Sequence, residues 1–85
     1  MTRVRCTPGE LRIIGALAAG KTYEVVAREL HLAPSTVRFH AAQLQRRFKV
    51  SNNAALIALA VISGLLAPGE WPPVLSGRAE VDLLI

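Results

Sequence analysis

Apolar residues recur every three or four positions along most of this chain, which is the spacing of helices that bury one face. The first such run contains Leu11, Ile14, Leu17 and Ala18. Thr7-Pro8-Gly9-Glu10 stands before it as a capping box with proline at the first helical position, and Gly20 after it is a common stop. The pattern predicts a first helix between Thr7 and Gly20.

A second, shorter run lies between Thr22, which can cap a helix, and a turn at His31-Leu32-Ala33. Its expected buried side chains are Val25, Val26, Ala27 and Leu30. One residue of the turn is expected to have a left-handed backbone, which histidine tolerates better than a β-branched residue does. The pattern therefore predicts two helices joined by a tight turn.

The third helix, which Pro34 opens, carries two different faces. Its apolar side groups Val37, His40, Ala41, Leu44 and Phe48. Its other side groups Arg38, Phe39, Ala42, Arg46 and Lys49. Ala33 is a poor cap, so the hydroxyls of Ser35 and Thr36 are expected to be free to face solvent or phosphate. A helix of this kind can pack on a core and enter a DNA groove at once, so residues 25–49 predict a helix-turn-helix that reads DNA sequence.

The fourth helix is expected at Ala54–Ser63, opened by Ser51-Asn52-Asn53 and ended by Gly64. It is apolar on all sides, and a domain of this size can cover only one of them. The uncovered side is therefore predicted to meet a second copy of the chain. The residues expected at this dimer interface are Leu56, Leu59, Ala60 and Ser63.

Eighty-five residues suggest one domain with a modest core. The predicted fold class is all-α, a four-helix helix-turn-helix domain over residues 1–67 with a tail over residues 68–85 that is docked or disordered. Prolines and glycines break the helical pattern in this tail, and Ala79–Ile85 is compatible with a docked tail, a short strand or disorder. Trp71 is expected to be a lid over the apolar core.

Charge is distributed unevenly along the chain. The net charge of +4 divides into +6 over residues 1–50, where nine Lys/Arg face three Glu, and −2 over residues 51–85, where Arg78 faces three acids. A basic half of this kind suits a protein that presents one face to a polyanion. The single Cys6 fits a reducing compartment, and no signal peptide or membrane span is apparent, so the expected location is the cytoplasm.

Few residues carry other chemistry. His40 faces the core side and is expected to be a hydrogen-bonded structural residue, while Cys6 is expected to be inert. Two histidines and one cysteine do not form a convincing tetrahedral metal site. No nucleophile–base pair or phosphate-cradling glycine loop is apparent, so neither enzymatic activity nor a cofactor is expected.

The motifs resemble the LuxR/GerE-type helix-turn-helix domain of bacterial transcription regulators over about Cys6–Leu66. The residues that carry the resemblance are Thr7-Pro8-x-Glu10, Gly20, Val26-Ala27-x-x-Leu30, Ser35-Thr36-Val37-Arg38-x-His40 and Val50-x-Asn52. The resemblance implies four helices, with the third in the major groove of DNA and the fourth pairing two subunits. It also implies base reading from Arg38, Phe39 and Ala42, and phosphate contacts near Ser35, Thr36, Arg46 and the start of the fourth helix.

The full set of residues expected to contact DNA combines the resemblance with the basic face of the third helix. It comprises Thr22, Ser35, Thr36, Arg38, Phe39, Ala42, Gln43, Arg46, Lys49, Asn52 and Asn53. Arg38 can bond guanine O6 and N7 in a bidentate manner or hold a phosphate. Phe39 can contact a thymine methyl or pack on a neighbouring side chain. Ala42 leaves room for close approach.

The chain departs from the family pattern at several positions. Glu24 stands where a phosphate-facing cation is usual, and Asn53 replaces an arginine at the start of the fourth helix. His31 and Lys49 replace the usual turn glycines. Family members usually carry a receiver or ligand-binding domain that this chain lacks, so regulation by phosphorylation or by a small molecule is not expected to carry over.

Two functional hypotheses follow from these patterns. The first is a bacterial transcription regulator that binds double-stranded DNA as a homodimer. The second is a helix-turn-helix-derived interaction module that heterodimerises with another regulator or contacts RNA polymerase, which the altered charge at Glu24 and Asn53 favours. No membrane partner is expected.

Overall fold

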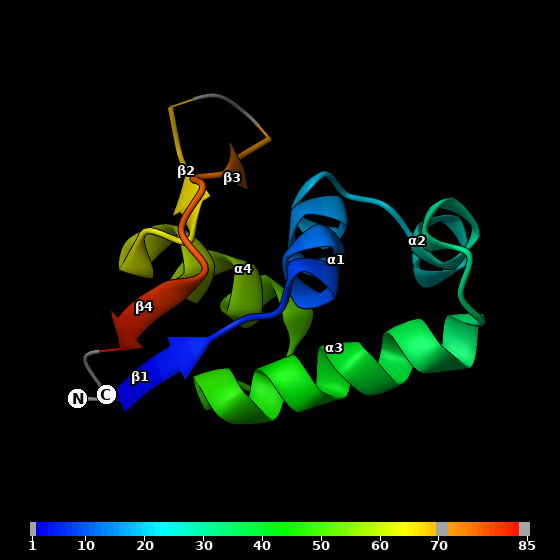
Figure 1. The fold of residues 1–85 in the computed structure, drawn as a ribbon, viewed down its shortest axis with the longest axis horizontal. Helices are drawn as coiled ribbons and strands as arrows, with labels where there is room; N and C mark the ends of the chain where they lie inside the picture. The colour runs from blue at the N-terminus through cyan, green and yellow to red at the C-terminus, as the bar shows by residue number, and fades with distance from the viewer. Residues whose placement is uncertain (1, 70–71, 84–85) are drawn as a thin grey trace.

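Four helices form the body of the protein in the order that the hydrophobic pattern predicts (Figure 1). The computed structural model describes residues 2–69 and 72–83. The helices are α1 (Pro8–Ala18), α2 (Tyr23–Leu30), α3 (Pro34–Phe48) and α4 (Asn53–Ser63). The predicted four-helix architecture is therefore confirmed.

The helix starts follow the predicted capping residues. In the capping box of α1, the Thr7 hydroxyl accepts from the Glu10 backbone N–H at 3.2 Å, and the Glu10 carboxylate accepts from the Thr7 N–H at 2.8 Å. The Thr22 hydroxyl caps α2, and the Asn52 side chain caps α4. Ala33 precedes α3 without a side-chain cap, as expected from its methyl side chain.

Three helices end at a residue with a left-handed backbone. His31 and Lys49 both have a φ of 57°, and Gly64 has a φ of 92°. The prediction that a residue of the turn after α2 is left-handed is thus confirmed at His31. In each case this residue ends the helix, and its backbone N–H donates to carbonyl oxygens of the last helical turn.

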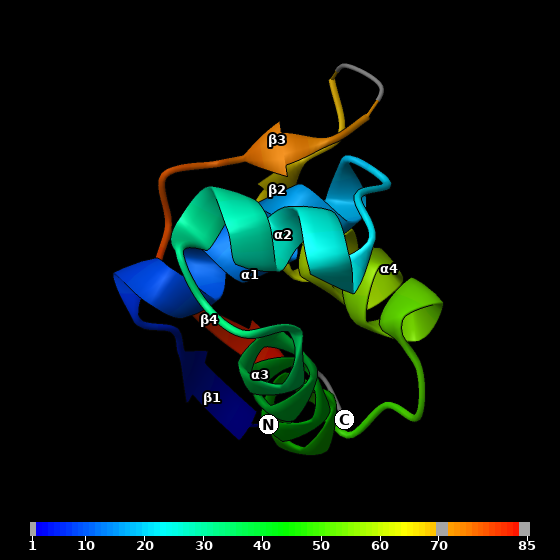
Figure 2. The same ribbon diagram turned by 90° about the vertical axis from the view of Figure 1, so that its right-hand side faces the viewer.

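The helix α3 runs along one side of the molecule (Figure 1). Helix α2 crosses over its N-terminal end, and viewed along α3 both α1 and α2 lie above it (Figure 2). Side chains of all four helices meet in one apolar core. Its largest fully buried members from the helices are Phe48, Ile13, Ile14, Leu44, Leu56, Val26 and Val37.

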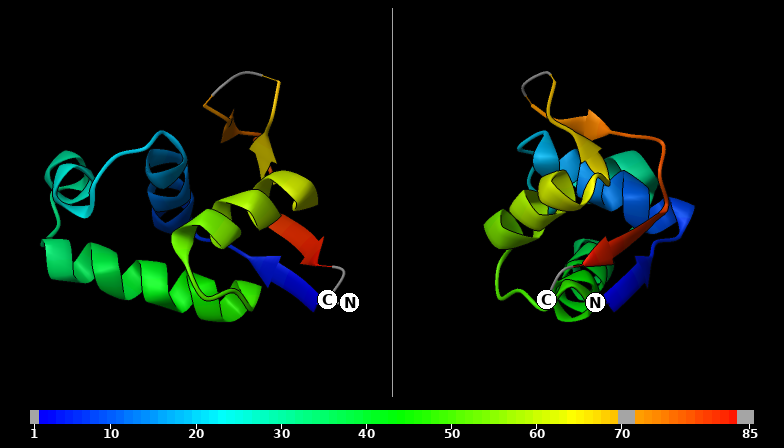
Figure 3. Two further views of the ribbon diagram at one scale, coloured as in Figure 1. Left: turned by 180° about the vertical axis from the view of Figure 1, so that it is seen from behind. Right: turned by 90° about the vertical axis from the view of Figure 1, so that its left-hand side faces the viewer.

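Four short strands accompany the helices, so the all-α prediction describes the helical body only. Strand β1 (Thr2–Arg5) pairs antiparallel with β4 (Glu80–Leu83), with Thr2 opposite Leu83 and Arg5 opposite Glu80. Strands β2 (Leu66–Ala67) and β3 (Val74–Leu75) form a second small antiparallel pair, on the opposite side of the molecule from α3 (Figure 3).

The β1–β4 pair joins the two ends of the described chain beside the C-terminal part of α3 (Figures 1 and 3). Val4, Val81 and Leu83 point into the core, each at most 4% exposed. On the outside, Arg3 bonds Asp82 at 2.9 Å and lies 3.6 Å from Glu80. Among the alternatives for the tail, residues 80–83 form a docked short strand.

The predicted boundary at residue 67 falls between two strands that pair with each other, because Leu66 and Ala67 bond to Leu75 and Val74. Trp71, the predicted lid, lies outside the described residues. No helix in residues 2–69 and 72–83 has the length and apolar content needed to cross a membrane.

Candidate nucleic-acid interface

One face of α3 is turned away from the core along the whole helix. Val37, Ala41 and Leu44 have no exposed surface, whereas the opposite side chains are open to solvent. The exposed residues, called here the α3 outer face, are Ser35, Arg38, Phe39, Ala42 and Arg46 of the helix and the cap residue Lys49 that follows it. Thr36 and Gln43 flank this face and are half-buried. Because α3 contains 15 residues, the face is roughly 22 Å long.

The cations of the α3 outer face have no acidic partner among the residues that the structure describes. Among the ion pairs of the described residues, none involves Arg38, Arg46 or Lys49. Between them stands Phe39, an aromatic residue with 55% of its surface exposed. An exposed helix face with unpaired cations and an exposed aromatic ring is suited to a polyanion that also presents apolar edges.

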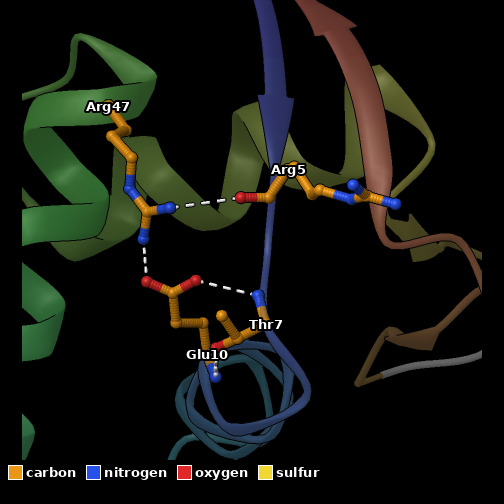
Figure 4. Close-up of polar contacts among 4 residues, drawn as sticks. All are labelled: Arg5, Thr7, Glu10 and Arg47. Atoms are coloured by element: carbon orange, nitrogen blue, oxygen red, sulfur yellow. Dashed lines mark hydrogen bonds and ion pairs between the residues drawn. The ribbon is translucent and has the colours of Figure 1, made fainter.

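Arg47 has a different environment from its neighbour Arg46. Its guanidinium bonds the Glu10 carboxylate and donates to the Arg5 carbonyl oxygen at 3.1 Å (Figure 4). Glu10 is also the capping residue of α1 and accepts from the Thr7 backbone N–H. The Arg47 side chain therefore connects α3 with both β1 and α1. Arg47 is therefore a structural residue, and sequence spacing alone could not reveal its partners.

A second polar network lies on the other side of α3. The amide of Asn53 donates to the Tyr23 hydroxyl at 2.8 Å and accepts from the Gln45 amide at 2.8 Å. The guanidinium of Arg38 lies over the Tyr23 ring, 5.4 Å from its centroid. Both ends of the Asn53 side chain are thus bonded within the protein. One N–H of the Asn53 amide remains as a donor, so its contact with DNA stays a prediction. Gln45 and Tyr23 are residues that the sequence pattern missed.

The two capping residues at the edges of this region are also partly engaged. The side-chain oxygen of Thr22 accepts from the Val25 N–H at 3.3 Å, and that of Asn52 accepts from the Ala55 N–H at 2.8 Å. Each still has a side-chain donor, since the Thr22 hydroxyl hydrogen and the Asn52 NH₂ group remain. Glu24 is exposed one residue into α2, where it adds a negative charge to this edge.

The outer side of α4 differs from the side predicted for the dimer interface. Leu56 and Ala60 have no exposed surface, because they pack inside their own chain, and they cannot contact a partner. Leu59 and Ser63 are half-buried at the margin. The residues that face solvent are Ala54, Ala58 and Ile62, one turn apart, and Ile62 is 79% exposed. The inner and outer sides of an all-apolar helix are not distinguishable from hydrophobicity alone.

The remaining candidate residues have structural environments. Burial raises the pKa of the Cys6 thiol, which keeps it protonated and unreactive. The half-buried ring of His40 packs against Phe39 with the ring centroids 5.8 Å apart, and the described hydrogen bonds do not include it, contrary to the expectation of a hydrogen-bonded histidine. Within the described part of the chain no group of three His, Cys, Asp or Glu could hold a metal ion.

Comparison with known proteins places these features in a family. The family model described as "Bacterial regulatory proteins, luxR family" matches residues 6–60. The chain is 37% identical over 57 residues to the "Probable transcriptional regulatory protein NarL" of two strains of Mycobacterium tuberculosis, CDC 1551 / Oshkosh and ATCC 25618 / H37Rv. The match covers 67% of this chain but only 26% of each relative, so the chain spans about a quarter of their length. No solved structure gives a significant match.

Proposed function

Because the chain belongs to the luxR family of bacterial regulatory proteins, we propose that it binds double-stranded DNA sequence-specifically as a homodimeric transcription regulator. The observation that carries this proposal is the α3 outer face, where Arg38, Arg46 and Lys49 are exposed and form no ion pair with any described residue. A helix of this diameter fits the major groove, where each base pair presents a distinct pattern of donors and acceptors.

Base reading is assigned to the first half of the α3 outer face. Arg38 offers two parallel N–H donors to guanine O6 and N7. Phe39, with its exposed ring, has no hydrogen bond to offer and suits a thymine methyl group. Ala42 is exposed and short, so it lets the helix approach the base edges closely.

Phosphate binding is assigned to residues around and beyond the base-reading ones. Arg46 and Lys49 supply charge, and the hydroxyls of Ser35 and Thr36 lie in the first turn of α3, where the partial positive charge of the helix N-terminus also attracts anions. Thr22, Gln43 and Asn52 offer further side-chain donors at the margins. These contacts provide affinity and a strong dependence on salt concentration.

The dimer contact is assigned to the exposed side of α4. Ala54 and Ala58 are small and allow two helices to approach closely, while Ile62 offers a large apolar side chain. Leu59 and Ser63 lie at the margin of this surface. Pairing two subunits about a two-fold axis would set the α3 helices into successive major grooves, with half-sites about 10 base pairs apart.

The experiment that tests this proposal is selection of duplexes from a random pool, followed by gel-shift titration. Arg38→Ala is expected to weaken binding to the selected duplex by roughly 1–3 kcal/mol and to leave binding to random duplex nearly unchanged. Arg12→Ala removes an exposed arginine from α1 and serves as the matched control. An equal loss on both duplexes would refute base reading by Arg38.

A second candidate function is favoured by two observations. Glu24 places an exposed acid at the edge of the proposed DNA surface, and both ends of the Asn53 amide are bonded within the protein. Both features would suit an interaction module that pairs with another regulator or with RNA polymerase. If the purified protein retains no duplex even at low salt, this second candidate replaces the first.

A further inference from the structure

Four side chains from three helices are linked in a row beneath the proposed DNA surface. Gln45 of α3 donates to Asn53 of α4 at 2.8 Å, and Asn53 donates to the Tyr23 hydroxyl of α2 at 2.8 Å. The Tyr23 ring in turn lies 5.4 Å from the Arg38 guanidinium carbon. The row therefore begins at Gln45 of α3, passes through the first turn of α4 and ends on the residue assigned to base reading.

Arg38 makes a cation–π contact with Tyr23, and the hydrogen bonds of the described residues do not include its N–H donors. A guanidinium stacked on an aromatic ring uses its flat face, whereas its N–H donors lie in the plane and point outward from its edge. The distance from the ring centroid is within the roughly 6 Å range of a cation–π interaction. An exposed arginine has many rotamers, and restricting them before binding reduces the entropy lost on binding.

We infer that Tyr23 is a positioning residue for base recognition: its ring holds Arg38 in the orientation that presents the guanidinium edge to the DNA, and Asn53 and Gln45 hold the ring. This inference rests on the proposed function, since it requires that Arg38 reads a base. It also gives α4 a second role, because this helix, which is assigned to the dimer contact, carries Asn53, and Asn53 bonds the Tyr23 hydroxyl.

A purely structural role of Tyr23 makes a different prediction. Tyr23 is half-buried and packs against the core, so its loss could lower stability without any relation to Arg38. In that case binding to every duplex would fall together, or not at all. A positioning role instead changes the preference between duplexes, and only while Arg38 is present.

The test is a double-mutant cycle of Tyr23→Leu and Arg38→Ala. Its probes are the best duplex selected by the wild-type chain and the same duplex with the Arg38-dependent base pair replaced. From the usual strength of an exposed cation–π contact, Tyr23→Leu is expected to reduce the preference between the two probes by about two- to fivefold. In the Arg38→Ala background Tyr23→Leu is expected to leave the preference unchanged. An equal effect in both backgrounds would overturn the inference.

Two controls keep the result interpretable. Tyr23→Phe keeps the ring but removes the hydroxyl that Asn53 bonds, so its preference is expected to lie between those of the wild type and Tyr23→Leu. A preference equal to that of the wild type would overturn the anchoring role of Asn53 and Gln45. A cycle of Tyr23→Leu with Arg46→Ala is expected to be additive, since Arg46 has no contact with the ring in the described structure. Circular dichroism at the assay temperature checks that each variant is folded.

Failure of the inference and failure of the proposed function give different results. If the wild-type chain binds no duplex at low salt, the proposed function fails and the inference fails with it. If the wild-type chain discriminates between the probes through Arg38 but Tyr23→Leu does not alter that discrimination, only the inference fails.

Discussion

Arg46 and Arg47 are adjacent on α3, yet their environments differ. Arg47 bonds Glu10 and the Arg5 carbonyl, whereas Arg46 points outward without an ion-pair partner among the described residues. Replacing each in turn by methionine keeps a long unbranched side chain with similar helix propensity. We expect Arg47→Met to destabilise the fold and Arg46→Met to weaken DNA binding.

The magnitude for Arg47→Met can be estimated from its contacts. The Glu10 side chain is only 14% exposed, so its bond to Arg47 is charge-assisted and partly desolvated, which corresponds to about 1.5–3 kcal/mol. The Arg47 side chain is 37% exposed, and solvent screening places the effect near the lower end of this range. With the bond to Arg5 included, we expect a loss of about 2 kcal/mol, or a Tm lower by roughly 8–16 °C.

The assay combines thermal unfolding with DNA binding at several salt concentrations. Arg46→Met is expected to change the free energy of unfolding by less than about 0.5 kcal/mol. It should reduce the slope of log K against log salt by about one per subunit, because one phosphate contact is removed. Glu10→Gln keeps the capping geometry, which tolerates glutamine, and should lose only the charge of the pair.

A shift in Tm of the same size for Arg46→Met and Arg47→Met would refute the assignment of roles. An Arg47→Met protein that unfolds at the wild-type temperature would also refute it, because the ion pair between Arg47 and Glu10 would then contribute nothing to stability.

Two further predictions concern the dimer and the strand pair. Ile62→Glu is expected to give a folded monomer by sedimentation, since Ile62 is 79% exposed within its own chain. Phe39→Glu on α3 should leave the oligomer intact, and a dimeric Ile62→Glu would contradict the α4 interface. The hydrogen bond from Arg3 lowers the pKa of Asp82 in the folded state. The stability that this bond adds to the fold is therefore complete above the ordinary carboxyl pKa of about 3.9, and it is lost as the pH falls through the lowered pKa of the folded state. Amide exchange in β1 and β4 should therefore accelerate in strong acid for the wild type, and an identical acid response of Asp82→Asn would contradict this.

The helices could be predicted because their signals are local. The caps Thr7, Thr22 and Asn52 and the left-handed His31 act on residues within one turn of themselves, so a short stretch of sequence contains both partners. The two faces of α3 could be predicted for the same reason, since its polar and apolar residues alternate with the helical period.

The contacts that could not be predicted join residues far apart in sequence. Asn53 was expected to contact DNA, but its hydrogen-bond partner Tyr23 lies 30 positions away in the sequence. The two side chains come within reach only when α2 and α4 occupy their places in the fold. The inner side of α4 is Leu56 and Ala60 because α1 and α3 lie there, and nothing within an all-apolar helix encodes that choice. Strand β4 has only four residues, too few for alternation to stand out.

The pairing of β1 with β4 also has a consequence for the order of folding. The bonds between Arg3 and Asp82 connect residues 79 positions apart, whereas the packing of α2 on α3 joins neighbours in the sequence. Closing a loop of this length costs roughly 2 kcal/mol more than closing one of about ten residues, because each doubling adds about 0.6 kcal/mol. The helix-turn-helix can therefore assemble before the ends meet. We expect the strand pair to form last and to open first in the native protein, at an energy below that of global unfolding.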